Sequence, residues 1–211
     1  MPGPAREHPD EARLAAARPS RLAWLVNAAS DPALVVAAVS TFVATRYSHS
    51  VLAGLAWTAL TIAFCVVIPY AVLLLLLRGG VVGDRHILRR EQRLWPNIGA
   101  ILSVAVGLAL LAWWGAPREL VALVLAELAS LGAISLVTLR SKASLHVAVT
   151  AGACGVVAVV QAHPLWWVGA VAATTVVGWA RARSGRHSVV QVVAGAVIGA
   201  AATAGVYLLV T

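Results

Sequence analysis

Charged residues are scarce in this sequence: they make up 11% of its 211 residues, against about a quarter of an average soluble domain. Hydrophobic residues reach 61%, and the mean hydropathy is +0.88. Several apolar runs are long enough to cross a bilayer core of about 30 Å, which takes roughly 20 helical residues. The composition therefore excludes an ordinary soluble domain and predicts a protein that is embedded in a membrane.

Acidic residues and cysteines are also few. Eight acidic residues stand against 16 basic ones, which leaves a formal net charge of +8. In a soluble chain this excess would suggest a nucleic-acid partner. Here the basic residues lie between apolar segments, so we expect them to set the membrane topology and to meet anionic lipid or substrate instead. The two cysteines, Cys65 and Cys154, lie inside apolar runs without metal or redox spacing, and we expect them to be buried core residues.

Seven apolar segments follow a polar, arginine-rich tail. We expect residues 22–29 to lie along the membrane surface, before the helix-start signal Ser30-Asp31-Pro32. The predicted spans are 32–45, 51–77, 97–114, 118–139, 144–161, 164–180 and 188–210. The first is too short to cross upright, so it is tilted, extends past Arg46 or is re-entrant. We predict an all-α bundle of six to seven spans, with a cytoplasmic region at 1–30 and a transmembrane domain at 31–211.

The basic residues are unevenly divided between the two sides that alternating crossings create. One side holds 14 of the 16, and the other keeps only Arg46 and Arg118. Because cytoplasmic loops are enriched in Lys and Arg, this favours seven spans with the N-terminus in the cytoplasm. With six spans, the arginines of the tail would lie outside. The first 20 residues contain no apolar stretch of a signal peptide, and we expect the cell membrane as the location.

Three loops on the basic side carry residues suited to anion binding. In the loop before the last span, Ser184-Gly185 breaks the helix, so that Arg181 ends one helix, His187 begins the next, and both can face one anion. The loop before the fifth span offers Lys142, Ser144 and His146. The loop after the second span adds further basic residues, namely Arg85, His86 and Arg93.

In this order, the three loops resemble the motifs of the type 2 phosphatidic acid phosphatase family, which is related to the vanadium haloperoxidases. That family carries Lys-x6-Arg-Pro, Pro-Ser-Gly-His and Ser-Arg-x5-His-x3-Asp. Here Arg181, His187 and Gln191 match the third motif, with glutamine in place of aspartate. Ser144 and His146 match the second, while Ala143 and Leu145 replace its proline and glycine. The first motif is the weakest match, because His86 replaces its lysine and Leu94 its proline, around Arg93.

The resemblance implies a lipid phosphatase that works without a metal or other cofactor. His187 would attack phosphorus to form a phosphohistidine, and His146 would protonate the leaving oxygen and later activate water. Gln191 would orient His187 as a neutral acceptor, which implies a slow enzyme or an inactive one. The expected phosphate-binding residues are Arg181, Arg93, Ser144, Arg85, His86 and Lys142. The substrate would be phosphatidate, phosphatidylglycerol phosphate or a polyprenyl phosphate or diphosphate.

Other interpretations remain open. Arginines at helix ends are often only topology markers, and a histidine at a helix start is often structural. The chain could be a degenerate relative that binds a phospholipid or a partner without hydrolysis, or a small transporter, although no internal repeat supports the latter. Gly195 and Gly199 form a small-xxx-small pair, which predicts close helix packing. Glu127, midway along the fourth span, could replace the missing aspartate, be protonated or pair with a neighbouring helix.

Overall fold

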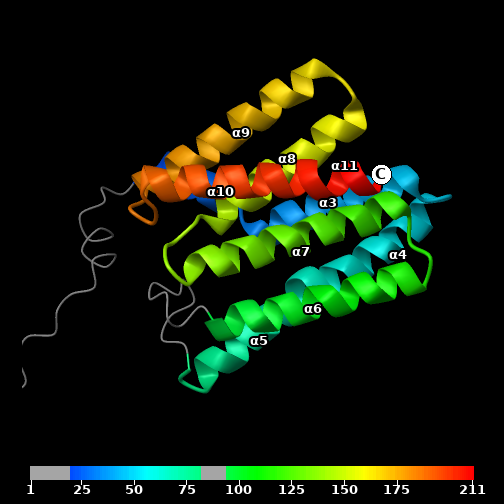
Figure 1. Ribbon diagram of the computed structural model, residues 1–211, viewed down its shortest axis with the longest axis horizontal. Helices are drawn as coiled ribbons and strands as arrows, with labels where there is room; N and C mark the ends of the chain where they lie inside the picture. The colour runs from blue at the N-terminus through cyan, green and yellow to red at the C-terminus, as the bar shows by residue number, and fades with distance from the viewer. Residues whose placement is uncertain (1–19, 82–93) are drawn as a thin grey trace, which may run out of the picture.

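A computed structural model describes residues 20–81 and 94–211, and every regular element within these ranges is a helix (Figure 1). The elements are α2 (Arg21–Ala29), α3 (Pro32–Tyr47), α4 (Val51–Ile62), η1 (Ala63–Val67), α5 (Ile68–Arg78), α6 (Leu94–Trp113), α7 (Arg118–Thr138), α8 (Leu145–Gln161), α9 (Pro164–Arg183), α10 (Val189–Ala202), η3 (Thr203–Tyr207) and α11 (Leu208–Val210). The prediction of an all-α chain is therefore confirmed for the described residues.

The helices begin where the sequence offers capping residues. The Asp31 carboxylate accepts a hydrogen bond from the backbone of Ala33 and caps α3, and Pro32 follows in the first turn. Ser188 caps α10 in the same way, through the backbone of Gln191. Because such caps stand out in an apolar sequence, the predicted starts of the helical segments agree closely with the observed ones.

Two long helices run through π-helical segments. Helices α4 and α5 continue through η1 as one rod from Val51 to Arg78, and α10 and α11 continue through η3 from Val189 to Val210. A π-helical turn shifts the backbone hydrogen bonding, and in η1 the carbonyl of Phe64 accepts a hydrogen bond from the Ser103 hydroxyl at 2.6 Å. The contact joins η1 to α6.

Four of the described helices are long and apolar enough to cross a membrane: Val51–Arg78, Trp95–Trp113, Arg118–Thr138 and Val189–Val210. A fifth span results if α2 and α3, which meet at a bend of 45°, are counted as one. Helix α8 is apolar but has only 17 residues. These helices suggest an integral membrane protein, while the predicted six to seven spans are not confirmed. Helix α3 extends past Arg46 to Tyr47, which is one of the alternatives for the short first segment.

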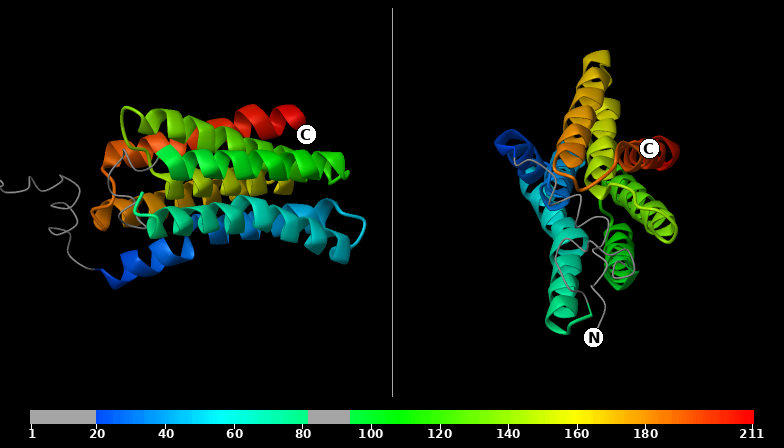
Figure 2. Two further views of the ribbon diagram at one scale, coloured as in Figure 1. Left: turned by 90° about the horizontal axis from the view of Figure 1, so that it is seen from below. Right: turned by 90° about the vertical axis from the view of Figure 1, so that its left-hand side faces the viewer.

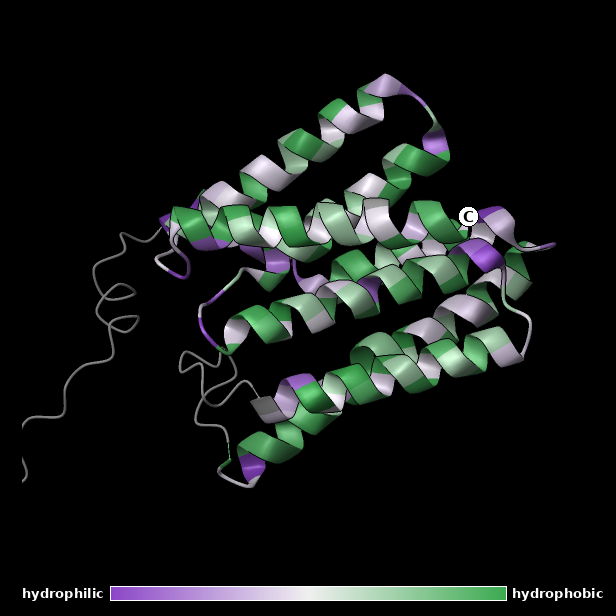
Figure 3. Cartoon of the chain, viewed as in Figure 1, coloured by the Kyte–Doolittle hydropathy of each residue, from purple (hydrophilic) through white to green (hydrophobic). Residues whose placement is uncertain are grey.

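The helices lie side by side along the long axis of the molecule (Figures 1 and 2). At one end lie α2, the start of α6 and the loops formed by residues 139–144 and 184–188, which we call the polar end. The opposite end carries residues 48–50, 114–117 and 162–163 and the C-terminus. Hydrophilic residues concentrate in the loops and near the helix ends (Figure 3). The predicted loops before the fifth and last spans therefore do share one end of the bundle.

A seam of small residues joins α8 to α10. A Cβ atom added to Gly195 would come within 2.5 Å of the Ser144 carbonyl oxygen, and one added to Gly199 within 2.1 Å of the Ala148 carbonyl oxygen. One turn further on, the Thr203 hydroxyl donates a hydrogen bond to the Gly152 carbonyl at 3.0 Å. The close packing predicted for Gly195 and Gly199 is confirmed.

The two cysteines differ from their prediction. Both Cys65 and Cys154 are free and only partly buried. Cys65 lies in η1, where it packs against the edge of the hydrophobic core and also lines a cavity between the helices. Apolar neighbours in the sequence could not reveal this, because burial depends on which helices pack against the residue.

Candidate functional site

His187 and Gln191 lie together at the polar end, as the sequence predicted from their spacing. His187 precedes the N-cap of α10 by one residue, and only 7% of its surface is exposed. Its ring nitrogen Nδ1 lies 3.2 Å from Oε1 of Gln191, on the first turn of α10. Gln191, and not Glu127, is therefore the residue that contacts the ring of His187.

The second contact of Gln191 identifies which atom of its amide faces the histidine ring. The same Oε1 accepts a hydrogen bond from the backbone N–H of Ser188 at 3.2 Å, and the Ser188 hydroxyl in turn accepts from the backbone N–H of Gln191. An N–H group can only donate, so the amide atom that faces Ser188 and His187 is the oxygen. In the neutral ring, Nδ1 of His187 then carries the hydrogen, and Nε2 carries the lone pair that a nucleophile needs.

Ser144 joins this pair through its backbone. Its N–H donates a hydrogen bond to the Gln191 carbonyl at 3.0 Å, which ties the start of α8 to the first turn of α10. The Ser144 side chain is fully buried, and its hydroxyl has no hydrogen-bond partner in the described part of the chain. It does not cap α8 either. A buried, unsatisfied hydroxyl is costly, so this group is available for a ligand but needs a local opening to reach one.

Arg181 lies in the last turn of α9 and is 92% buried, since only 8% of its surface is exposed. Its Nη1 atom donates to Oδ1 of Asn27 at 3.5 Å. Asn27 in turn donates from Nδ2 to the Ser184 hydroxyl at 2.8 Å and to the Ala180 carbonyl at 3.4 Å. Helix α2 is therefore fastened to the end of α9 around the arginine that the sequence predicted to bind phosphate.

His146 and Lys142 flank Ser144 on its two sides. His146 is half-buried in the first turn of α8, and its carbonyl accepts a hydrogen bond from Thr150. Lys142 lies in the loop formed by residues 139–144, where burial lowers the pKa of its ammonium group below the usual value. A phosphate beside Lys142 would offset this desolvation, because an opposite charge favours the charged form.

The predicted site is thus assembled in part. Residues from three segments of the sequence meet at the polar end, and a chain of contacts joins Ser144, Gln191 and His187. Arg85, His86 and Arg93, which the resemblance assigns to phosphate binding, lie outside the described residues. Within the described ranges, no group of three or more His, Cys, Asp or Glu side chains is arranged to hold a metal ion.

Sequence reasoning missed two features of the site. Asn27 carried no signal, because its partners lie more than 150 residues away along the chain. The capping box formed by Ser188 and Gln191 was detectable, since serine followed three residues later by glutamine before an apolar run is a known helix start. Gln191 therefore has a structural role in addition to the orienting role predicted for it.

Comparison with known proteins adds no relative: no protein-family model, no curated protein and no solved structure matches the chain.

Proposed function

We propose that this protein is a membrane lipid phosphatase that hydrolyses a phosphomonoester or diphosphate of a lipid. The candidate substrates are phosphatidate, phosphatidylglycerol phosphate and polyprenyl phosphates or diphosphates. The observation that carries the proposal is the orientation of His187, whose Nδ1 lies against an acceptor oxygen, an arrangement that leaves the lone pair of the neutral ring on Nε2. Apolar helices around this polar end suit a substrate with a long apolar tail.

The reaction would proceed in two balanced steps. First, Nε2 of His187 forms a bond to phosphorus while the bond from phosphorus to the lipid oxygen breaks, and His146 gives that oxygen its proton. Second, His146 takes a proton from water, whose oxygen attacks phosphorus and releases inorganic phosphate from His187. Arg181 and Lys142 would stabilise the negative charge on the phosphoryl oxygens, and the Ser144 hydroxyl would donate to one of them.

The proposed topology has seven spans, with the polar end and the N-terminus in the cytoplasm. It is supported by the excess of basic residues on the polar side and by the helices observed at all seven predicted segments. In intact cells, a membrane-impermeant thiol reagent should then label His49→Cys at the opposite end and leave Ser141→Cys unlabelled. Labelling of Ser141→Cys alone would show the opposite orientation, with the polar end outside the cell.

A second candidate function, lipid binding without turnover, is favoured by one observation. The acceptor held against His187 is a neutral amide whose oxygen is shared with the Ser188 N–H. A charged acceptor is about twice as strong as a neutral one, so the imidazolium formed during transfer is less well stabilised than with an aspartate. A binding protein would retain the cations and hydroxyl of the site without needing this stabilisation.

The deciding experiment measures phosphate release by the full chain, purified in detergent with a chelator present, from phosphatidate, phosphatidylglycerol phosphate and polyprenyl diphosphate. We expect release from at least one lipid, abolished in His187→Ala and retained in His49→Ala, a matched change of an exposed histidine at the opposite end. If folded protein releases no phosphate from any of the three lipids, the phosphatase proposal is rejected. Saturable binding of the same lipids, weakened in Arg181→Gln, would then establish the binding protein.

A further inference from the structure

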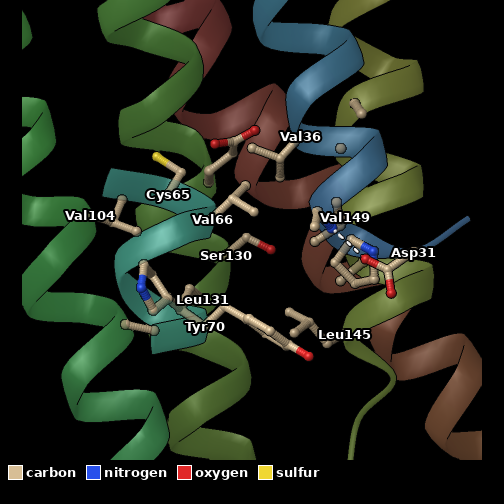
Figure 4. Close-up of a pocket in the computed structure, with 18 of the residues that line it drawn as sticks. Asp31, Val36, Cys65, Val66, Tyr70, Val104, Ser130, Leu131, Leu145 and Val149 are labelled. Atoms are coloured by element: carbon tan, nitrogen blue, oxygen red, sulfur yellow. Dashed lines mark hydrogen bonds between the residues drawn. The ribbon is translucent and has the colours of Figure 1, made fainter. Parts of the chain in front are cut away.

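A cavity of about 870 Å³ lies between α3, η1, α5, α6, α7, α8 and α10 (Figure 4). This volume is within the range of small-molecule sites, which is about 300–1,000 Å³. Its walls are mostly aliphatic, with Val36, Val66, Val104 and Leu131 among them. The cavity is separate from His187, Arg181 and Gln191, none of which line it.

The charged residues of the cavity wall have one sign. Among the described residues that line it, Asp31 and Glu127 are acidic and none is basic. This is notable in a chain whose basic residues outnumber its acidic ones by two to one. A carboxylate in an apolar surrounding needs a cationic partner or a proton, and none of the described residues in the wall of this cavity is a cation.

Two of the polar residues that line the cavity, Glu127 and Ser130, lie close together. They lie three residues apart on α7, so their side chains share one face of the helix. Oε2 of Glu127 and the Ser130 hydroxyl are both buried, and neither has a hydrogen-bond partner within the described residues. Figure 4 shows the Ser130 hydroxyl directed toward the middle of the cavity.

The behaviour of Ser130 differs from that of other hydroxyls on the same helix. Ser135 and Thr138 each donate to the carbonyl four residues earlier, at 2.7 Å, which is the usual way to satisfy a hydroxyl inside a helix. The Ser130 side chain is 92% buried, since only 8% of it is exposed, yet it makes no such bond. Both oxygen groups lie just beneath the surface of the cavity, so a ligand reaches them only after a small local movement of the wall. Buried groups without partners are costly, and a ligand that binds both would remove the cost.

Glu127 lies far from both ends of the bundle. It is 11 residues from the end of α7 at Thr138, which corresponds to about 16 Å along the axis. The basic residues at the ends of α7 and in the loops cannot neutralise it at this depth without crossing the apolar wall. Glu127 is therefore either protonated or, when it is ionised, neutralised by a cation on a molecule that enters the cavity.

We propose that the cavity binds a long-chain primary amine, with its ammonium group between the carboxylate of Glu127 and the hydroxyl of Ser130. The ammonium has three donors, which suits two acceptor groups on one helix face, and it supplies the missing charge. The alkyl chain lies against the aliphatic wall. This site is independent of the phosphate site at the polar end, and its ligand needs no phosphate.

The test measures equilibrium binding of radiolabelled dodecylamine and of radiolabelled dodecanol to the full chain in a neutral detergent. We expect dodecylamine to bind with saturation, about tenfold more weakly to Glu127→Gln and severalfold more weakly to Ser130→Ala. Dodecanol should bind weakly and equally to the unaltered chain and to Glu127→Gln. Equal affinity for both compounds, or an unchanged affinity of Glu127→Gln for dodecylamine, would overturn the proposal and leave an apolar cavity that any chain can enter.

A second variant locates the site without touching either polar group. Ala100 on α6 lines the cavity, and Ala100→Phe fills part of it. This variant should lose dodecylamine binding while its thermal unfolding without ligand stays close to that of the unaltered chain. Undiminished binding in folded Ala100→Phe would contradict the placement. The glutamine of Glu127→Gln has nearly the same shape as glutamate, so unfolding of that variant is not expected.

Discussion

Helices α8 and α10 border two regions that differ sharply in packing. On one side they meet along the seam, where Gly195 and Gly199 bring the two backbones together. On the other side, Ala148 and Gly199 also line the cavity of about 870 Å³ that α5, α6 and α7 leave open. The same small residues therefore permit close contact where a helix is opposite and leave space where none is.

The polar groups of the two regions differ in the same way. In the seam, the Thr203 hydroxyl donates to a carbonyl and is satisfied, although Thr203 also borders the cavity. In the cavity, Glu127 and Ser130 retain unsatisfied oxygen atoms. The exception in the seam is Ser144, whose buried hydroxyl lacks a partner among the described residues. It is also the hydroxyl that the phosphatase proposal needs.

The largest effect is expected from adding a methyl group to a glycine of the seam. In Gly199→Ala the added methyl group would meet the Ala148 backbone, which cannot move away as a side chain could. We expect a loss of about 3 kcal/mol, or roughly 6–12 °C in the unfolding temperature in detergent. The matched control is Gly132→Ala on α7, where a Cβ meets nothing within 4 Å and helix propensity favours alanine. Equal unfolding temperatures of the two variants would show that the seam is not closely packed.

Removing single hydroxyls compares the two regions directly. Thr203→Val keeps the shape of the side chain but removes its hydrogen bond to Gly152, and should cost about 1 kcal/mol of unfolding free energy. Ser130→Ala removes a buried group without a partner and should leave the unfolding free energy unchanged or raise it slightly. Thermal unfolding of both variants in the same detergent checks this. If Ser130→Ala proves the more destabilised of the two, Ser130 is bound to something that the described residues do not include.

A negative charge at position 191, beside His187, should alter the rate of phosphate release. Gln191→Glu keeps the capping box and places a carboxylate against His187. A charged acceptor is stronger than a neutral one by about 1 kcal/mol, so we expect roughly a fivefold faster release. Gln191→Met, which keeps the length but provides only a weak acceptor, should release phosphate more slowly than the unaltered chain. A rate that is the same in all three proteins would remove Gln191 from the mechanism.

The helices could be predicted from the sequence because capping residues interrupt its apolar runs. Asp31-Pro32, His163-Pro164 and Ser188 begin helices in the structure where the sequence placed them. The contact of His187 with Gln191 was also predictable, since the two residues are one helical turn apart. Local spacing was sufficient in each of these cases.

Features that depend on distant parts of the chain could not be predicted. The hydrogen bonds of Asn27 to Ser184 and Arg181 join α2 to the end of α9. The cavity is lined by helices from distant parts of the chain, and no sequence pattern records the space between apolar helices. The position of Ser130 on α7 was predictable, but the absence of its usual bond to the preceding turn was not.

The smallest expected effect comes from Ser144→Ala, and its sign separates a structural hydroxyl from a ligand-binding one. The side chain is fully buried and its hydroxyl has no partner among the described residues, so alanine should raise the unfolding free energy by about 0.5 kcal/mol. If the hydroxyl binds phosphate, the same variant should release phosphate several times more slowly despite its higher stability. Thermal unfolding and phosphate release, measured on one preparation, decide the question. A variant that is less stable and equally active would show that Ser144 serves the packing of α8 alone.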